Sequence, residues 1–370
     1  LYKTLKNSMT LDTWEDWPQN LRDPTKEQYQ ELLYLHKKTI AFYSMLQYLC
    51  HEQLSSVKEY AARQHVFLKG DIPILISPDS VDVWLERSLF DVHYAVGYPP
   101  DVFNKEGQLW GFPTFKWHII EASHFAWWKE RLQVGSRYYH LYRLDHIVGF
   151  YKLWLIPKGH KPKEGAYSPP TLEEALDAGQ RYLSRIIPSS SMLPVGEDLG
   201  NIPREVFDSL YRLGIPGTRV LRWEKEWDND KHFFPINTYS PLSMTCVSTH
   251  DSETLALWWR DYPEEAKEYC HFRGWSYIED LPKEYRLGIL QDAHNSSSLF
   301  HINLFQEYLA LFPELVHEDP EVERINRPGF VLPSNWTYRF RQNLESILAH
   351  KGLREIFCHL IPNNGNNHVL

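Results

Sequence analysis

Short runs of apolar residues alternate along the chain with longer stretches in which apolar residues recur at helical spacing. Strands that are apolar throughout, rather than at every second position, are typical of a parallel sheet covered by helices. The pattern therefore predicts an α/β fold. Strands are expected at 66–76, 140–145, 193–197, 218–223, 244–250 and 330–332, and helices at 172–187, 203–213 and 264–269.

A long helix is predicted near the start of the chain, after a polar, irregular segment over residues 1–26. Asp23 or Thr25 can cap its first turn, because both side chains accept hydrogen bonds from free backbone N–H groups. The apolar positions that follow have helical spacing up to about residue 63, so we expect them to form one buried stripe. These positions are Leu32, Leu33, Leu35, Ile40, Phe42, Leu46, Tyr48 and Leu49.

Two stretches are too long to be simple connections between strands. Residues 78–139, which follow the strand near Asp71, are rich in loop-forming and aromatic residues. Residues 252–325, which precede the last predicted strand, have a mostly helical pattern. We therefore expect a single domain over residues 1–370 that carries one insertion subdomain and one helical insertion.

The composition narrows the choice of partners and location. With 39 basic and 48 acidic residues the net charge is −9, so the chain lacks the basic surface that nucleic acid binding needs. No apolar run reaches the ~18 residues of a membrane span. The four cysteines form no CxxC pair, which favours free thiols in the cytoplasm. Aromatic residues reach 15%, which suits either a sugar-binding cleft or a well-packed core.

Four acidic residues lie within or just after predicted apolar strands: Asp71, Asp145, Glu197 and Asp251. In a parallel barrel, groups at the carboxyl ends of the strands open on one face, so four carboxylates far apart in sequence can meet in one cleft. The alternative is that each carboxylate caps the helix that follows its strand. We favour the cleft, because four separate capping carboxylates at four strand ends would be a coincidence.

Two pairs of residues add detail to this cleft. Arg143 and Asp145 are two positions apart on one strand, so their side chains share a face, and the guanidinium favours the ionised carboxylate that a nucleophile must be. An ordinary ion pair at a strand end is the alternative. His250 beside Asp251 suits hydrogen bonding to a sugar hydroxyl, or else is a half-buried structural histidine. No histidine or cysteine has metal-ligand spacing, and no motif of serine hydrolases, P-loop enzymes or Rossmann dehydrogenases is present.

Several segments, in order along nearly the whole chain, resemble glycoside hydrolase family 77, the 4-α-glucanotransferases or amylomaltases of the α-amylase clan. Residues 70–74, 142–146, 195–200 and 248–251 resemble the four conserved regions of that clan. One match alone would be weak, whereas nine in order are specific. The other five segments are 79–84, 97–103, 107–111, 214–221 and 335–336.

The resemblance implies a (β/α)8 barrel that works by a retaining mechanism, without metal or organic cofactor. Asp145 then matches the nucleophile, Glu197 the general acid/base and Asp251 the transition-state stabiliser. Retention requires the first two carboxyls to lie ~5–5.5 Å apart across the glycosidic bond. The remaining matches are substrate-binding: Asp71, Arg143 and His250 in the first subsite, and Trp110 as a platform for the acceptor sugar, with a buried structural Trp as the alternative.

The implied activity is transfer of α-1,4-glucan segments between maltooligosaccharides through a covalent glycosyl–Asp intermediate. A hydrolase of the same clan and a glucan-binding barrel without activity are the alternatives. Only six barrel strands are predicted, whereas a closed barrel of this type has eight, and an open barrel would leave two exposed edges. We therefore expect the chain to be the C-terminal part of a longer enzyme, with the missing N-terminal part of that enzyme as a partner.

Overall fold

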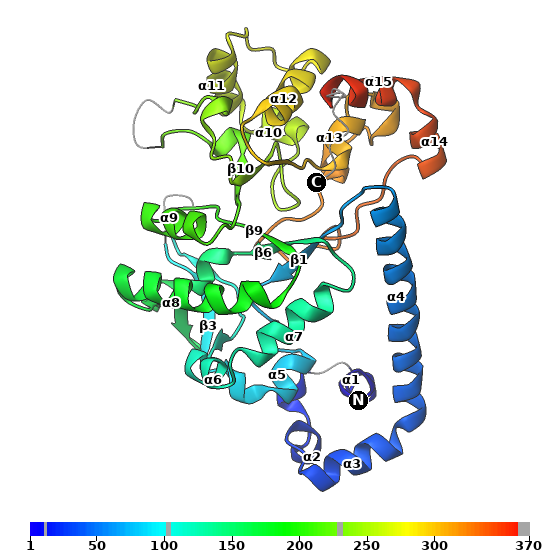
Figure 1. The fold of residues 1–370 in the computed structure, drawn as a ribbon, viewed down its shortest axis with the longest axis vertical. Coiled ribbons are helices and arrows are strands. Elements are labelled where there is room, and N and C mark those ends of the chain that lie inside the picture. The colour runs from blue at the N-terminus through cyan, green and yellow to red at the C-terminus, as the bar shows by residue number, and fades with distance from the viewer. Residues whose placement is uncertain (11–12, 101–104, 228–231, 362–370) are drawn as a thin grey trace. The chain divides into compact units, whose positions relative to one another are not determined.

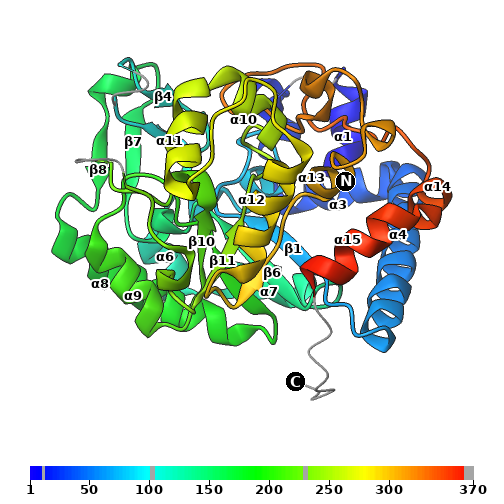
Figure 2. The ribbon, with the colours of Figure 1, turned by 90° about the horizontal axis from the view of Figure 1, so that it is seen from above.

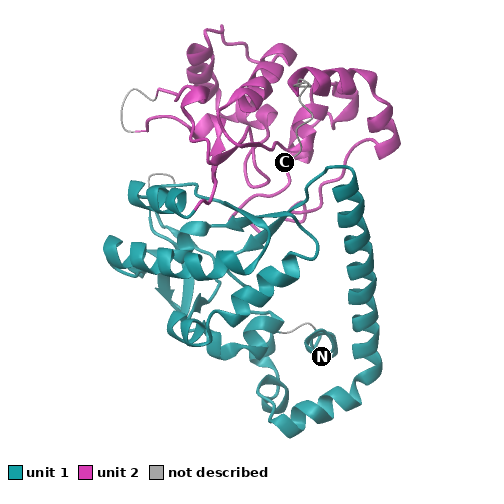
Figure 3. Ribbon diagram, viewed as in Figure 1, with its two compact units in different colours: residues 1–213 teal, residues 214–370 magenta. Residues whose placement is uncertain are grey.

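The computed structural model describes residues 1–10, 13–100, 105–227 and 232–361. The chain divides into two compact units, Leu1–Leu213 (unit 1) and Gly214–Leu370 (unit 2), which Figure 3 shows in different colours. None of the helices over the described ranges is both long and apolar enough to cross a membrane.

Unit 1 contains a parallel sheet with the strand order β1-β6-β9. Three of the predicted strands are thereby confirmed, each within a few residues of its expected bounds. In the register, Asp71 lies opposite Arg143 and Leu144 lies opposite Gly196. Adjacent parallel strands that end at the same level bring their carboxyl ends to one edge. The strands are β1 (Lys69–Pro73), β6 (Leu141–Asp145) and β9 (Leu193–Gly196).

The stretch 78–139 contributes short strands and helices to unit 1. Four of its strands join two later strands in small antiparallel sheets, ordered β4-β3-β7-β8 and β2-β5. Aromatic side chains of this stretch pack against one another, as Phe115 does against Trp128. Many of its aromatic residues therefore belong to the core of unit 1. The strands are β2 (Phe90–Asp91), β3 (Tyr94–Tyr98), β4 (Gln108–Leu109), β5 (Thr114–Phe115), β7 (Leu153–Pro157) and β8 (Ala166–Ser168).

Helix α8 illustrates why the helices of unit 1 form where they do. Thr171 and Glu174 exchange side-chain and backbone hydrogen bonds at its start, a capping box that satisfies two free N–H groups. Its apolar face is buried, and Gly179 lets the ring of Tyr151 pack against the helix backbone, because a Cβ there would lie 2.2 Å from the ring. The helices are α1 (Tyr2–Ser8), α2 (Gln19–Arg22), α3 (Lys26–Leu35), α4 (Lys37–Arg63), α5 (Val81–Leu85), α6 (Trp117–Ala122), α7 (Ala126–Gly135), α8 (Leu172–Ile186) and α9 (Arg204–Arg212).

The long helix predicted near the start is present as α3 and α4, and Thr25 caps it. The expected burial of its apolar stripe is wrong. Leu32 is buried, whereas Leu35, Phe42 and Leu49 are exposed. Helix α4 runs along one side of unit 1 (Figure 1), and periodicity alone does not say what covers a helix face.

Unit 2 contains a second parallel sheet, β10-β11-β12, made of β10 (Gly217–Val220), β11 (Ser243–Cys246) and β12 (Phe300–His301). The strand predicted at 330–332 is wrong. Those residues follow a turn at Pro328-Gly329, and Val331 is fully exposed. The third strand is instead Phe300–His301, within the stretch 252–325 that was expected to be mostly helical.

The helices of unit 2 enclose an aromatic core that includes Trp258, Trp259 and Tyr269. Figure 2 shows α12 beside α15, and Gln291 of α12 is hydrogen-bonded to His359 of α15. All four cysteines of the chain are free, and Cys246 and Cys270 are buried. The helices are α10 (Leu255–Asp261), α11 (Pro263–Arg273), α12 (Lys283–Asn295), α13 (Phe305–Leu309), α14 (Leu344–Ala349) and α15 (Lys351–Leu360).

Candidate active site

Strands β1 and β6 hold three charged side chains next to one another in unit 1. Nη1 of Arg143 donates to both carboxylate oxygens of Asp71, at 3.0 and 3.1 Å, and its Nη2 lies 2.7 Å from Oδ1 of Asp145. The Arg143 side chain is only 14% exposed, whereas the side chains of Asp71 and Asp145 are 48% and 39% exposed. The expected shared face of Arg143 and Asp145 is thus confirmed, and one guanidinium orients two accessible carboxylates.

Glu197 directly follows β9, the strand that pairs with the other side of β6. The backbone N–H groups of His146 and Leu199 donate to its two carboxylate oxygens, at 2.9 and 3.0 Å. The N–H of Glu197 itself donates to the carbonyl of Leu144, which continues the ladder between the two strands. The backbone of two neighbouring strand ends therefore holds this carboxyl group in place.

The environment of Glu197 raises its pKa to about 7. Burial is the largest cause, because it disfavours the charged carboxylate, and the negative charge of Asp145 acts in the same direction. Arg143 and the two backbone N–H groups lower the pKa but do not offset the burial. Near neutral pH this group can therefore both donate and accept a proton, which is what general acid/base catalysis requires.

His146 connects Glu197 with the aromatic residues beside it. Burial and the charge of Arg143 lower the pKa of its imidazole to about 4, so the ring is neutral at physiological pH. The ring of Trp110 meets the His146 ring edge to face at 5.0 Å and stacks with Tyr98 at 6.4 Å. Trp110 is half-buried, as a platform for a ligand would be, and a small cavity of about 30 Å³ lies beside His146 and Leu199.

The other two predicted residues lie in unit 2, shortly after β11. Nε2 of His250 lies 3.2 Å from Oδ2 of Asp251, and the two side chains are 24% and 38% exposed. Nδ2 of Asn326 donates to Oδ1 of Asp251 at 2.7 Å, and its backbone N–H donates to the carbonyl of His250 at 3.1 Å. The ring of Trp336 lies 5.2 Å from the His250 ring. Asp251 is thus held from two sides by side-chain contacts.

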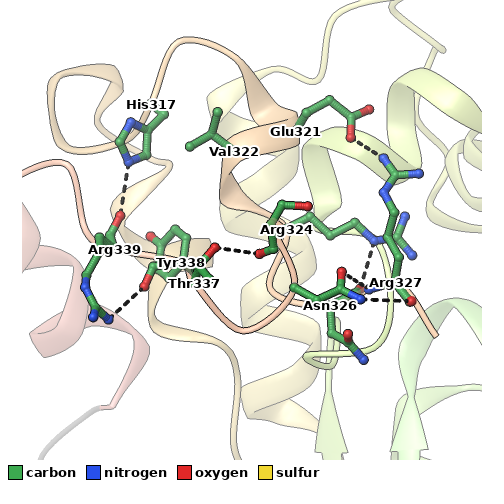
Figure 4. Close-up of a pocket in the computed structure, with 11 residues that line it drawn as sticks. His317, Glu321, Val322, Arg324, Asn326, Arg327, Thr337, Tyr338 and Arg339 are labelled. Atoms are coloured by element: carbon green, nitrogen blue, oxygen red, sulfur yellow. Dashed lines mark hydrogen bonds and ion pairs between the residues drawn. The ribbon is translucent and has the colours of Figure 1, made fainter. Parts of the chain in front are cut away.

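Asn326 is a residue of this site that the sequence pattern did not predict. It lies two positions before Pro328-Gly329, a dipeptide that marks a turn, whereas we had expected a strand close by. Asn326 also lines a pocket of about 450 Å³ in unit 2, together with Arg324, Arg327 and Tyr338, and pockets of this size hold small ligands. Among the residues that line this pocket, Figure 4 shows Arg327 directed to Glu321 and His317 hydrogen-bonded to the carbonyl of Arg339.

The structure thus brings Asp71, Arg143, Asp145 and Glu197 together in unit 1, with Trp110 nearby, and it pairs His250 with Asp251 in unit 2. Within the described ranges, no group of three or more His, Cys, Asp or Glu side chains is arranged to hold a metal ion. Residues 101–103 of one family segment lie outside the described part of the chain. An ion-paired carboxylate next to a carboxyl with a pKa near neutrality can perform nucleophilic and acid/base chemistry on one bond.

Comparison with known proteins identifies the family. The family model described as 4-alpha-glucanotransferase, glycoside hydrolase family 77, matches residues 1–345. A 4-alpha-glucanotransferase of Chlamydia pneumoniae is 43% identical over 350 residues, which cover 95% of this chain and 66% of that protein. A chloroplastic/amyloplastic 4-alpha-glucanotransferase of Solanum tuberosum is 27% identical, over 91% of this chain and 57% of the relative. The chain thus spans less than two thirds of the length of these relatives.

A solved structure, an amylomaltase from Streptococcus agalactiae in complex with acarbose, superposes with a TM-score of 0.79 at 24% identity, over 97% of this chain and 70% of that one. This likeness gives the chain the amylomaltase fold, the (β/α)8 class that the motifs led us to expect. The parallel strands of the described residues form two three-stranded sheets rather than one closed barrel. The chain therefore belongs to glycoside hydrolase family 77, the 4-alpha-glucanotransferases.

Proposed function

We propose that this chain carries the catalytic groups of a retaining 4-α-glucanotransferase, which moves α-1,4-glucan segments between maltooligosaccharides. The observation that supports this most strongly is the contrast between two neighbouring carboxyl groups. Asp145 is ion-paired with Arg143, which favours its charged form, while the pKa of Glu197 is raised to about 7, mainly by burial. A charged nucleophile next to a protonated acid is what a retaining mechanism needs.

In the first step, the carboxylate of Asp145 attacks the anomeric carbon of the donor glucan, and the bond from that carbon to the glycosidic oxygen breaks. Glu197 gives its proton to that oxygen, so the leaving chain departs as an alcohol and a glycosyl ester remains on Asp145. Asp251 is proposed to stabilise the positive charge that develops on the sugar ring. Asp71 and His250 are proposed to hold hydroxyls of the same ring.

In the second step, the 4-hydroxyl of an acceptor sugar attacks the ester, and Glu197, now ionised, takes up its proton. Asp145 is released as a carboxylate, and the two displacements together retain the α configuration. Water at the same position would give hydrolysis. The half-buried ring of Trp110, next to the His146 ring, is proposed to favour a sugar over water by offering an apolar face on which the acceptor can stack.

The organisation of the whole protein is part of this proposal. We propose one catalytic barrel domain over residues 1–370, with an insertion subdomain at 78–139 and a helical insertion at 252–325, and with the barrel incomplete at its N-terminal side. The chain covers only 66% of the length of the Chlamydia pneumoniae relative, which supports the incompleteness. A cytoplasmic location is likewise proposed, and the four free cysteines support it.

Incubation with pure maltotriose tests the activity. Transfer predicts glucose together with maltooligosaccharides longer than maltotriose, at a rate that Asp145→Asn abolishes. If glucose and maltose are the only products, the hydrolase alternative is correct instead. Glucan binding without any turnover, by a protein that includes the missing barrel strands, would assign a binding module.

A further inference from the structure

His250 and Asp251 lie in the middle of a short irregular segment of unit 2, between β11 and α10. We call this segment, residues 247–254, the Asp251 loop. Ser248 lies near its start and is 2% exposed, and Leu255, the first residue of α10, directly follows it. Because such a segment has no ladder of backbone hydrogen bonds of its own, the contacts at its two ends decide how firmly the side chains between them are held.

Both ends of the Asp251 loop are hydrogen-bonded to one side chain, that of Glu307 on α13. Its Oε1 accepts from the hydroxyl of Ser248 at 2.6 Å and from the backbone N–H of Leu255 at 3.0 Å. That N–H belongs to the first turn of α10, where the helix itself offers no carbonyl to accept it. One carboxylate oxygen thus joins two residues that flank His250 and Asp251 along the chain.

Glu307 is itself held by a buried ion pair. Its side chain is 1% exposed, and its Oε2 lies 3.2 Å from Nη1 of Arg286 on α12, whose side chain is 8% exposed. Burial raises the pKa of the Glu307 carboxyl, and Arg286 and the two hydrogen bonds from the loop offset only part of that rise. A well-packed apolar pair is often as stable as a buried ion pair, so folding alone does not explain a carboxylate here.

A second connection leads from the same loop to the partner of Asp251. Glu253 pairs with Arg222 at 2.7 Å and with Arg324 at 2.8 Å. Arg324 lies two positions before Asn326, which donates to the carboxylate of Asp251. Charged contacts therefore hold the side of the loop that carries Glu253, while Glu307 holds its two ends.

We propose that Glu307 is a positioning residue for glucan transfer, which fixes both ends of the Asp251 loop and thereby the placement of Asp251 and His250 against the sugar ring. The role rests on the proposed function, since it takes Asp251 as the group that stabilises the transition state. Glu307 acts on the reaction only through the loop. Its loss should lower kcat more than it raises KM, because the transition state requires stricter geometry than the bound donor.

Two double variants separate the hydrogen bonds of Glu307 from its charge. The leucine variant, Arg286→Leu/Glu307→Leu, removes both the ion pair and the acceptor. The glutamine variant, Arg286→Leu/Glu307→Gln, removes the ion pair but keeps an amide oxygen that can accept from Ser248 and Leu255. With an α-maltosyl fluoride donor, we expect kcat to fall roughly 10- to 100-fold in the leucine variant and at most about threefold in the glutamine variant.

A further pair of measurements distinguishes positioning from general support of the fold. In an Asp251→Asn background the leucine variant should lower the rate by at most about threefold, because the group through which Glu307 acts is already lost. The matched control is Arg273→Leu/Asp292→Leu. Asp292 is also buried and accepts from a hydroxyl and a guanidinium, but these belong to Tyr269 and Arg273 of α11. This control should lower the melting temperature, as the leucine variant does, and leave kcat unchanged.

Hydrogen exchange tests the hold on the loop without any turnover. The amides of residues 248–255 should exchange at least about tenfold faster in the leucine variant than in the glutamine variant. Three results would overturn the proposal: equal kcat in the two double variants, an equal effect of the leucine variant with and without Asp251, or equal exchange of the loop in both variants. If the parent chain has no turnover, the proposed function fails, and the exchange comparison still decides whether Glu307 holds the Asp251 loop.

Discussion

The backbone N–H of His146 donates a hydrogen bond of 2.9 Å to Oε2 of Glu197, although 51 positions separate the two residues. His146 lies directly after β6 with a φ of 48°, a left-handed conformation that residues other than glycine adopt rarely. The turn follows Asp145 immediately, so one local conformation places the proposed nucleophile and fixes the acid/base beside it.

The pH dependence of turnover should reflect Glu197. Its pKa is raised to about 7 by burial first and by Asp145 second, so the proton needed by the leaving group is lost as the pH rises through about 7. We expect kcat/KM for a maltooligosaccharide donor to fall on the alkaline side with an apparent pKa near 7. A glycosyl fluoride donor, whose leaving group needs no proton, should lack this alkaline limb. An identical limb for both donors would assign it to another group.

Folding stability should depend on the same group. Because the pKa of Glu197 is higher in the folded chain than its ordinary value of 4.5, the folded state favours the protonated form. Its contribution is fully present below about pH 4.5 and is lost as the pH rises through about 7. Relative to Glu197→Gln, the parent chain should therefore lose roughly 1–3 kcal/mol of unfolding free energy between pH 5 and pH 8. Denaturant unfolding of both proteins at the two pH values measures this loss. If the stability difference between the parent chain and Glu197→Gln is the same at both pH values, the raised pKa of Glu197 is contradicted.

Replacement of Arg143 should impair catalysis rather than folding. A lysine at this position is a single point charge and cannot orient Asp71 and Asp145 at once, so we expect Arg143→Lys to lower kcat by roughly 10- to 100-fold. Arg181→Lys is the matched control, because Arg181 also bridges two carboxylates, those of Glu121 and Asp177, on the exposed surface of α8. Equal effects of the two substitutions on kcat would show that the Arg143 contacts are structural only.

Asn326 should contribute to catalysis by holding the carboxylate of Asp251 in place. Its side chain donates to that carboxylate at 2.7 Å, and a hydrogen bond to a charged group contributes about 1.5–3 kcal/mol. Asn326→Ala should lower kcat by about tenfold or more while the melting temperature changes little. Asn326→Asp should be worse, because it places a second negative charge against Asp251. An unchanged kcat in the alanine variant would show that Asn326 does not contribute to catalysis.

The sequence predicted the part of the site that follows from strand rules. Alternation along β6 put Arg143 and Asp145 on one face, and the ends of parallel strands put Asp71 and Glu197 next to them, because both rules depend only on neighbouring backbone. The raised pKa of Glu197 did not follow from those rules. It depends on burial and on the distances to other charges, which only the folded structure supplies.

Strand rules of this kind could predict neither which helix faces are buried nor where the last strand lies. The periodicity of α4 is helical, yet its apolar side faces solvent. A helical pattern identifies an apolar face, but it does not identify the element that would cover that face. The apolar residues at 330–332 satisfied a strand pattern, but the turn at Pro328-Gly329 leaves Val331 in solvent. The same error concealed Asn326, whose role rests on a contact with a residue 75 positions away.

Trapping the glycosyl intermediate tests whether Asp145 is the nucleophile. Glu197→Gln should still react with an α-maltosyl fluoride, because fluoride leaves without a proton, but it lacks the base that activates the acceptor in the second step. We expect mass spectrometry of a protease digest to find one added glycosyl group, on the peptide that contains Asp145. A label on another carboxylate, or no label in a variant that still releases fluoride in a single-turnover burst, would contradict it.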